Sequence, residues 1–420
     1  METIRSTHPN NTLMQCVSLY IPPILAFQMN CCKQEVAGKR VVVIGGGYSG
    51  MAVASLLDGD FRVTVIEPRA KLVHKIGGVR ACVRSEWAEP ILVPQKKVMM
   101  SGRILNFPVQ SIDTQAKKVF YKNGNNTVME VPFDYLVIAS GGHSLSPAEP
   151  PASADMKLHD HYVNVAVRIA ASRKIVIIGG GPVGVELAGE IMAKHPKKDL
   201  TLIHQGSKLC DNIKATAPSD FSIAIKSKLE GKGVKVQLNT TAKLTKEDFN
   251  GKAYLEGKRN VELSYGQRIE DVDLVLMCAG YVPSTSFLPA KMLNDKKLVK
   301  VDAKLRVRGE QEVFSIGDCN DVNETKKYVT AVTKEGKMDG WPRGQADVVA
   351  DNIRALAEGK AELSSYEPNN KYFGYIIPIG PNDSVVAGFP DNFGAFKAST
   401  FFIAGQWEAA NLAAPELPTL

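Results

Sequence analysis

The stretch Val41-Val42-Val43-Ile44-Gly45-Gly46-Gly47-Tyr48-Ser49-Gly50 decides the fold of this chain. Its apolar run is typical of a strand buried on both faces, and the glycines follow that strand directly. Gly45 can form the tight turn, Gly47 lets the backbone approach a pyrophosphate, and Gly50 lets the next helix pack closely on the strand. The N-terminus of that helix favours phosphate, because it offers unpaired N–H groups and a positive dipole end. The stretch therefore predicts a dinucleotide site formed by Gly45, Gly46, Gly47, Tyr48, Ser49 and Gly50.

The residues that follow complete a strand–helix–strand unit. Met51–Leu57 has helical spacing, and Phe61–Ile66 is a second apolar strand that is closed by Glu67. Glu67 comes 22 residues after Gly45 (67 − 45), where a carboxylate can accept hydrogen bonds from a ribose diol. A glycine-rich turn alone is weak evidence, but strand, glycines, helix, strand and acid in register are specific. This unit predicts a site for an unphosphorylated ribose, such as that of FAD.

The same unit returns later in the chain. Ile175–Ile178 leads into the loop 179–184, which is followed by an expected helix and by a strand from Asp199 to His204. The loops begin 134 residues apart (179 − 45), which predicts two dinucleotides on one chain. His204 stands where an NAD-selective site usually has a carboxylate, so a 2′-phosphate would not be repelled there and His204 or Lys208 could contact it. Both NADH and NADPH are therefore expected at a second site that contains Gly179, Gly181, Gly184 and His204.

Three further segments end as strands of a nucleotide-binding sheet do. Residues 133–142 and 273–280 are apolar runs that close in small residues, and each lies after its own glycine loop. The third run, Val313–Asp318, delivers one acid at its carboxyl end. Gly317 allows close backbone approach, and Asp318 could hydrogen-bond a ribitol hydroxyl. In isolation this acid is typical of an ordinary turn, but its place after the other segments favours a role at the nucleotide.

Composition excludes several classes of protein. A chain of 420 residues with 44% apolar and 23% charged residues fits two or three ordinary globular domains. The net charge of +7 is spread along the chain, so no nucleic-acid partner is expected, although an anionic membrane surface or substrate would suit it. The seven cysteines form no CxxC or CxxxxC pair. This argues against a disulfide framework, a zinc ribbon and a redox dithiol, and it fits a reducing compartment.

Residues 1 to about 38 differ from the rest. Leu13–Phe27 is mostly apolar, but it is interrupted by Pro22-Pro23 and is shorter than the ~20 residues of a membrane-spanning helix. The alternatives are a disordered tail, a secretory segment, and an extension before a true start at Met29, which would leave Cys31 and Cys32 open to S-acylation. N-myristoylation is excluded for either start, because no glycine follows Met1 or Met29.

The order of these segments resembles that of the two-dinucleotide-binding flavoprotein family of pyridine nucleotide-dependent oxidoreductases, across about residues 39–365. A narrower similarity is to the apoptosis-inducing-factor-like group, which includes NAD(P)H:quinone reductases of the ferroptosis suppressor type. It is carried by residues 185–191, 201–204 and 316–321, with a hairpin at 381–383. The resemblance implies an α/β fold with two Rossmann-like domains that bind FAD and NAD(P)H, and a small α+β C-terminal domain. The expected boundaries are 1–38 for an extension, 39–148 with 298–365 for the FAD domain, 149–297 for the NAD(P)H domain, and 366–420 for the C-terminal domain.

The resemblance also implies roles for single residues. FAD contacts beyond the glycine loop would come from Glu67, Arg80, Val109 and Asp318. Arg80 could meet the pyrophosphate as a bidentate fork or could be a structural arginine, and the sequence leaves both open. Val109 would use only its backbone on the adenine. The catalytic candidates are Glu186, which would orient the nicotinamide, Lys397, which would stabilise negative charge, and Phe402, which would form a wall of the acceptor pocket. The alternative for Glu186 is an acid that is merely favoured by the helix dipole.

The expected function follows from cofactor chemistry. Disulfide reductases of the family carry a cysteine pair after the first unit, where this chain has Cys82 alone. The flavin itself would therefore carry the electrons. Hydride would pass from NADH or NADPH to FAD, and electrons would then pass to a quinone-type acceptor. The alternatives are a soluble reductase of a protein or radical acceptor, and a non-enzymatic role in cell death. A cytoplasmic location with possible peripheral membrane contact is expected. The sequence specifies neither the acceptor nor the oligomeric state.

Overall fold

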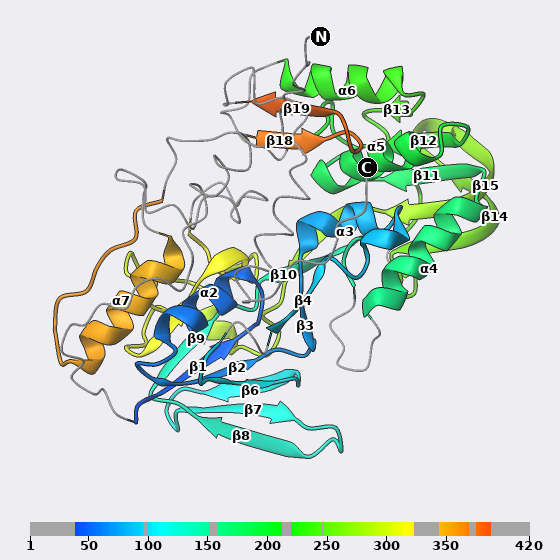
Figure 1. Cartoon of the computed structure of the whole chain (residues 1–420). Coiled ribbons are helices and arrows are strands. Elements are labelled where there is room, and N and C mark those ends of the chain that lie inside the picture. Colours follow the sequence, from blue (N-terminus) through cyan, green and yellow to red (C-terminus); the bar gives the residue numbers. More distant parts are fainter. Residues whose placement is uncertain are drawn as a thin grey trace, which may run out of the picture.

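The computed structural model describes residues 38–95, 99–150, 158–211, 220–245, 247–322, 344–368 and 375–387, with only the backbone at 375, 376, 386 and 387. Within these ranges the chain forms two α/β units, each built on a five-stranded sheet (Figure 1). The α/β fold with two Rossmann-like units is therefore confirmed. The N-terminal extension and most of the expected C-terminal domain, with Lys397 and Phe402, lie outside the described residues.

The first sheet is entirely parallel. Its order is β17 (Val313–Ser315), β9 (Tyr135–Ile138), β1 (Arg40–Ile44), β2 (Arg62–Ile66) and β5 (Arg103–Leu105). The central strand β1 is an uninterrupted apolar run because the sheet is covered on both faces, and Val41, Val42 and Val43 are fully buried. Since β17 follows the second sheet in the chain, the first unit is made from two separate stretches of sequence.

Different elements cover the two faces of the first sheet. Helices α2 (Tyr48–Leu57) and α7 (Gln345–Ala357) lie on one face, and an antiparallel sheet of β6 (Val109–Asp113), β7 (Lys118–Lys122) and β8 (Val128–Pro132) lies on the other (Figure 1). Side chains from all of these elements share one hydrophobic core with β1. The core therefore fixes the carboxyl ends of β1, β2, β9 and β17 at one edge of the sheet.

The second sheet repeats the arrangement of the first. Its order is β13 (Lys235–Gln237), β12 (Asp199–Ile203), β11 (Lys174–Ile178), β15 (Arg268–Met277) and the antiparallel edge strand β14 (Tyr254–Glu262). Ile178 pairs with Ile203 and Met277, just as Ile44 pairs with Ile66 and Ile138. The helices of this unit are α4 (Leu158–Ala171), α5 (Pro182–Lys194) and α6 (Phe221–Gly231).

Smaller elements join the two units. The strands β10 (Gly142–Leu145) and β16 (Ala279–Pro283) pair where the chain leaves each main sheet. A short hairpin of β3 (Lys71–Val73) and β4 (Leu92–Pro94) belongs with the helix α3 (Lys75–Ala81), which packs on α5. Single 3-10 turns complete the described secondary structure at η1 (Ser85–Trp87), η3 (Ser264–Gly266), η4 (Ala290–Met292) and η5 (Gly317–Cys319).

A hairpin beyond α7 returns to the second unit. The strands β18 (Tyr375–Pro378) and β19 (Ser384–Ala387) pair around the turn that contains Pro381-Asn382-Asp383. Gly189 in the middle of α5 permits this contact, because a Cβ atom there would come 2.6 Å from the carbonyl carbon of Ile379. Asp383 forms ion pairs with Lys228 at 2.7 Å and Lys232 at 3.3 Å. The hairpin therefore packs on α5 and α6.

Candidate functional site

The first glycine loop has the geometry that a dinucleotide requires. Gly45 has φ +105°, a conformation that favours glycine, and a Cβ atom on Gly50 would come 1.9 Å from the Gly45 carbonyl oxygen. Gly47 is the N-cap of α2, and a Cβ atom there would meet nothing within 4 Å. The free space beside Gly47 lies at the helix N-terminus, where backbone N–H groups and the dipole favour phosphate. The loop therefore fits the pyrophosphate of FAD.

Glu67 closes the first loop from the neighbouring strand. It follows β2 directly, is 7% exposed, and its Oε2 accepts the N–H of Gly46 at 2.8 Å. Its Oε1 accepts the N–H of Arg69 at 3.1 Å. Gln95, which the sequence analysis did not single out, donates from Nε2 to the Gly46 carbonyl at 3.1 Å. Glu67 thus lies directly against the first glycine loop, and its contact with a ribose stays a prediction.

The turn that carries Asp318 lies beside the same loop. Gly317 has φ +78°, and a Cβ atom on it would come 2.8 Å from Ser49 Oγ. The amide of Gly317 donates to Gln345 Oε1 at 2.9 Å, which fixes the turn against the start of α7. Asp318 is exposed, and its carbonyl accepts the hydroxyl of Tyr281 at 2.9 Å. The structure therefore brings the first glycine loop, the β2 end and the Asp318 turn together at one sheet edge.

Tyr48 and Val109 belong to this region in different ways. The Tyr48 hydroxyl lies 2.7 Å from His74 Nδ1, and burial raises the pKa of Tyr48 and lowers that of His74 to about 3. This hydrogen bond to a neutral imidazole anchors the Tyr48 side chain against the residues just before α3. Val109 begins β6 and packs partly buried against the core of the first unit. Its contact with adenine stays a prediction.

The second glycine loop repeats the first. Gly179 has φ +115°, Gly181 is the N-cap of α5, and a Cβ atom on Gly184 would come 1.9 Å from the Gly179 carbonyl oxygen. The Gly180 amide donates to His204 Nδ1 at 3.2 Å, so His204 takes the place that Glu67 has in the first unit. His204 is 8% exposed. The second loop therefore fits a dinucleotide as well.

An acid lies near His204, although the strand itself ends in no carboxylate. Asp211 Oδ2 lies 3.4 Å from His204 Nε2, although the two residues are seven positions apart (211 − 204). No sequence pattern pointed to Asp211, because it belongs to a turn after the strand and not to the strand end. The sequence expectation that position 204 carries no acid holds, and the nearby carboxylate comes from a later turn.

Glu186 lies in the first turns of α5, close to the second glycine loop. Burial, together with the nearby Glu190 carboxylate, raises its pKa to about 8, although the Arg80 guanidinium acts in the opposite direction. A carboxyl group with this pKa holds its proton at neutral pH. Glu186 can therefore donate a hydrogen bond here, which an ordinary exposed glutamate on a helix does not do. Its role toward nicotinamide stays a prediction.

Arg80 has a defined partner. Its Nε donates to Glu190 Oε1 at 2.8 Å, and its Cζ lies 5.2 Å from the centroid of the buried Trp87 ring. Arg84 adds a second contact to Glu190 at 3.4 Å. Of the two interpretations that the sequence left open, this geometry favours the structural one, because the ion pair fixes α3 on α5. Glu190 lies one helical turn after Glu186 but was not singled out from the sequence.

The described cysteines are free thiols. Cys82, Cys210, Cys278 and Cys319 are all buried. Burial raises the pKa of Cys82 and Cys210 and raises that of Cys278 to about 12. A protonated, buried thiol is a poor nucleophile. These four residues therefore give no support to dithiol chemistry.

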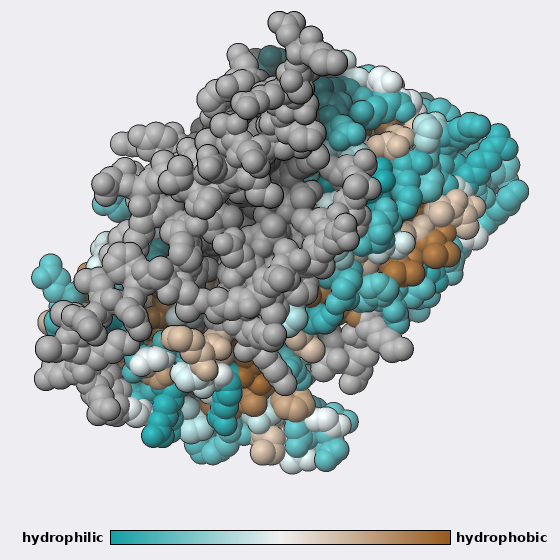
Figure 2. All heavy atoms as spheres, viewed as in Figure 1, coloured by the Kyte–Doolittle hydropathy of each residue, from teal (hydrophilic) through white to brown (hydrophobic). Residues whose placement is uncertain are grey.

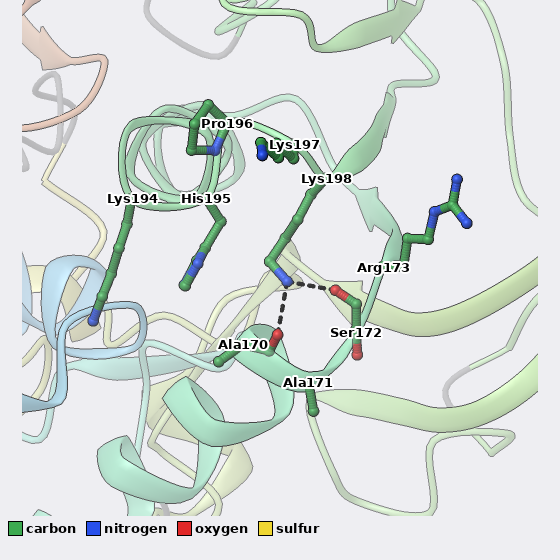
Figure 3. Close-up of a pocket in the computed structure, with 9 residues that line it drawn as sticks. All are labelled: Ala170, Ala171, Ser172, Arg173, Lys194, His195, Pro196, Lys197 and Lys198. Atoms are coloured by element: carbon green, nitrogen blue, oxygen red, sulfur yellow. Dashed lines mark hydrogen bonds between the residues drawn. The ribbon is translucent and has the colours of Figure 1, made fainter.

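A basic pocket of about 450 Å³ lies at the other edge of the second sheet, where β11 and β12 begin (Figure 3). In Figure 3, the Lys198 ammonium points between Ala170 and Ser172, and it donates to both of their carbonyl oxygens. These contacts cap the last turn of α4. Burial and the charges of Lys198 and Lys194 lower the pKa of His195. Because nucleotides bind at the carboxyl ends of parallel strands, this pocket is separate from the candidate site.

The described residues contain neither a metal-binding group of three or more His, Cys, Asp or Glu nor a helix long and apolar enough to span a membrane.

The face of the molecule in Figure 2 is mostly hydrophilic where it is described, with a hydrophobic patch over α4. Val167 on α4 is 60% exposed.

Comparison with known proteins places the chain in a family. A family model described as pyridine nucleotide-disulphide oxidoreductase matches residues 39–338. The chain belongs to this family. Apoptosis-inducing factor homolog B of Dictyostelium discoideum is 29% identical over 366 residues, which cover 83% of this chain and 89% of that protein. Ferroptosis suppressor protein 1 of Xenopus laevis is 29% identical over 353 residues, which cover 82% of this chain and 87% of that protein.

Solved structures agree on the fold of this oxidoreductase. The sulfide:quinone oxidoreductase of the hyperthermophilic bacterium Aquifex aeolicus has a TM-score of 0.61 at 17% identity, with 90% of this chain and 93% of that chain covered. The resemblance to flavoprotein oxidoreductases and to the apoptosis-inducing-factor-like group is therefore confirmed.

Proposed function

We propose that this family member is an FAD-dependent NAD(P)H oxidoreductase that passes electrons to a quinone-type acceptor without a redox-active disulfide. The observation that carries the proposal is the repetition of one loop geometry with two different closing residues, Glu67 at the first loop and His204 at the second. A buried carboxylate that accepts the Gly46 amide suits the ribose of FAD. The second loop, closed by an imidazole, suits the exchangeable pyridine nucleotide.

The side chains divide the task in a simple way. FAD, when bound, would supply the hydride acceptance and the electron release. Gly47 and the N-terminus of α2 would hold its pyrophosphate in the loop shaped by Gly45 and Gly50, and Glu67 would orient the ribose beside them. Asp318, on the turn beside the same loop, would contact a ribitol hydroxyl. Glu186, with its pKa of about 8, holds a proton near the second loop and is the candidate that fixes the nicotinamide amide.

The contact between α3 and α5 keeps the two sites in a constant relation. The buried pair of Arg80 and Glu190 fixes α3 on α5, and His74, directly before α3, contacts Tyr48 of α2. Hydride transfer needs reacting atoms about 3–3.5 Å apart, so a small shift between the units would slow it strongly. Arg80 is therefore a positioning residue in this proposal.

A quinone is favoured as the acceptor on two grounds. The first ground is the resemblance to the group that contains NAD(P)H:quinone reductases, which is carried by the segments 185–191, 201–204 and 316–321. The second is that the A. aeolicus protein of similar fold is named a sulfide:quinone oxidoreductase. Lys397 and Phe402 remain the proposed residues of the acceptor pocket, to stabilise negative charge and to form its wall. We also propose a cytoplasmic location with peripheral membrane contact, which a net charge of +7 supports.

Acceptor assays test this proposal. The purified protein is given NADH and, in separate reactions, a short-chain ubiquinone, ferredoxin or the monodehydroascorbate radical. Quinone turnover well above that of the other acceptors supports the proposal. Turnover of ferredoxin or the radical alone would replace it with a soluble reductase, and no flavin-dependent turnover of any acceptor would favour a non-enzymatic role.

Phe402→Ala separates acceptor binding from cofactor binding. The substitution should slow flavin reoxidation by quinone or raise the quinone KM, while flavin reduction by NADH stays near wild type. Stopped-flow measurement of the two half-reactions distinguishes these effects. Equal loss in both would mean that Phe402 supports the fold and that the acceptor binds elsewhere.

A further inference from the structure

We infer that Asp211 and His204 together form the adenine-ribose subsite of the second nucleotide loop and that the pair favours NADH over NADPH. The inference rests on the proposed function, because it names the substrate preference of the same site. It assigns the carboxylate that selects against a 2′-phosphate to a turn after β12, and not to the last residue of the strand.

The register of the two sheets locates the subsite. Glu67 follows Ile66, which pairs with Ile44, and His204 follows Ile203, which pairs with Ile178. Both closing side chains accept the amide of the second loop glycine. His204 therefore lies at the equivalent position to the ribose acid of the first unit.

The turn at 209–211 is held against the glycine loop. The Cys210 amide donates to the Gly180 carbonyl at 2.8 Å, and Leu209 Cδ2 would lie 2.6 Å from a Cβ atom on Gly180. Gly206 leaves room for the carboxylate, because a Cβ atom there would come 2.3 Å from Asp211 Oδ2 and 2.8 Å from His204 Nε2. The proximity of Asp211 to His204 is therefore a consequence of backbone contacts and of a glycine.

The two side chains offer complementary groups. Because Nδ1 of His204 accepts the Gly180 amide, the neutral ring carries its proton on Nε2. This Nε2 is buried and has no hydrogen bond to any described residue, although Asp211 Oδ2 lies 3.4 Å away. The Asp211 side chain is 49% exposed, so a ligand can reach it. The pair thus presents one donor and one acceptor.

A ribose 2′-hydroxyl matches this pair, and a 2′-phosphate does not. The hydroxyl can accept from Nε2–H and donate to the carboxylate. A phosphate offers only acceptor oxygens at neutral pH and carries about two negative charges, so it is repelled by the Asp211 carboxylate. The subsite therefore recognises NADH better than NADPH.

Binding of oxidised nucleotides to the FAD-loaded protein tests the inference directly. Dissociation constants for NAD⁺ and NADP⁺ are measured by isothermal titration calorimetry at one pH, for wild type, Asp211→Asn and Asp211→Ser. Wild type should bind NAD⁺ more tightly. Both substitutions should shift the ratio of the two constants toward NADP⁺ by roughly tenfold, the factor that corresponds to about 1.4 kcal/mol.

Asp199→Asn is the matched control, because Asp199 begins the same strand at its far end and pairs there with Lys235. It should leave the ratio unchanged. A ratio that stays within about twofold of wild type in both Asp211 variants, with FAD bound and NADH still reducing it, would overturn the inference and leave the proposed function standing. A wild-type protein that binds neither nucleotide would overturn both.

Discussion

Arg80 of α3 and Glu190 of α5 form a buried ion pair although they are 110 residues apart in the chain, with 2.8 Å between Nε and Oε1. The exposed fractions of their side chains are 7% and 4%. A buried charge without its partner is strongly unfavourable, so each residue requires the other. The pair fixes α3 on α5, and His74, directly before α3, contacts Tyr48 at the first glycine loop.

Loss of this pair should destabilise the protein. Glu190→Ala leaves the Arg80 guanidinium buried without its partner, and we expect the free energy of unfolding to fall by about 3–5 kcal/mol. Urea denaturation of both proteins measures this difference in the free energy of unfolding. Glu230→Gln is the control, because Glu230 pairs with Lys226 on the exposed face of α6 and should cost no more than about 1 kcal/mol. Equal stability of Glu190→Ala and wild type would refute the structural role of Arg80.

Glu186 should make stability depend on pH. Its pKa rises from 4.5 to about 8 on folding, so the folded protein holds a proton that the unfolded chain releases between these values. The free energy of unfolding should therefore fall as pH rises from about 4.5 to 8 and change no further through this group above that range. Glu186→Gln should gain stability relative to wild type at pH 9 and very little at pH 5. An equal effect of the substitution at both pH values would show that Glu186 is not protonated in the folded protein.

Gly47 should be essential for FAD but not for folding. A Cβ atom at Gly47 meets no protein atom within 4 Å, so Gly47→Val should fold, yet its side chain would occupy the space of the pyrophosphate. The variant should be purified without flavin absorbance while its circular dichroism stays close to that of wild type. Gly124→Val, at another glycine with open space, should keep FAD. Full FAD content in folded Gly47→Val would show that the first loop is assigned incorrectly.

All seven cysteines should be dispensable for NADH oxidation. Cys82 and Cys319 are replaced by serine, because the Cys82 thiol donates to the Pro147 carbonyl at 3.0 Å and the Cys319 thiol has similar contacts. The other five become alanine. The variant should retain FAD and quinone turnover within about tenfold of wild type, since the cofactor and not a thiol carries the electrons. A folded, FAD-loaded variant that reduces flavin but no quinone would contradict this.

The sequence predicts those parts of the fold that depend on neighbouring residues. Each glycine loop, its strand and its helix are contiguous, so the turn at Gly45 and the close packing at Gly50 can be inferred from spacing alone. Glu67 and His204 follow in the same way from the length of a strand–helix–strand unit. The hairpin at Pro381-Asn382-Asp383 is expected from the family resemblance, and the structure shows it.

Contacts between distant segments could not be predicted. Asp211 reaches His204 through a turn whose shape depends on the glycine loop behind it, and Gln95 reaches Gly46 from another hairpin. An arginine at position 80 suits a phosphate and a glutamate equally well, and only the packing of α3 on α5 shows that Arg80 pairs with Glu190. Such partners are determined by tertiary structure, which leaves no local pattern in the sequence.

Anaerobic titration of the purified protein with NADH, followed by absorbance, tests the central claim most directly. The protein should be yellow and should release FAD and not FMN on denaturation. Stoichiometric NADH should bleach its flavin absorbance, and a quinone should restore it. A colourless protein, or a bound flavin that excess NADH and NADPH both leave oxidised, would contradict it.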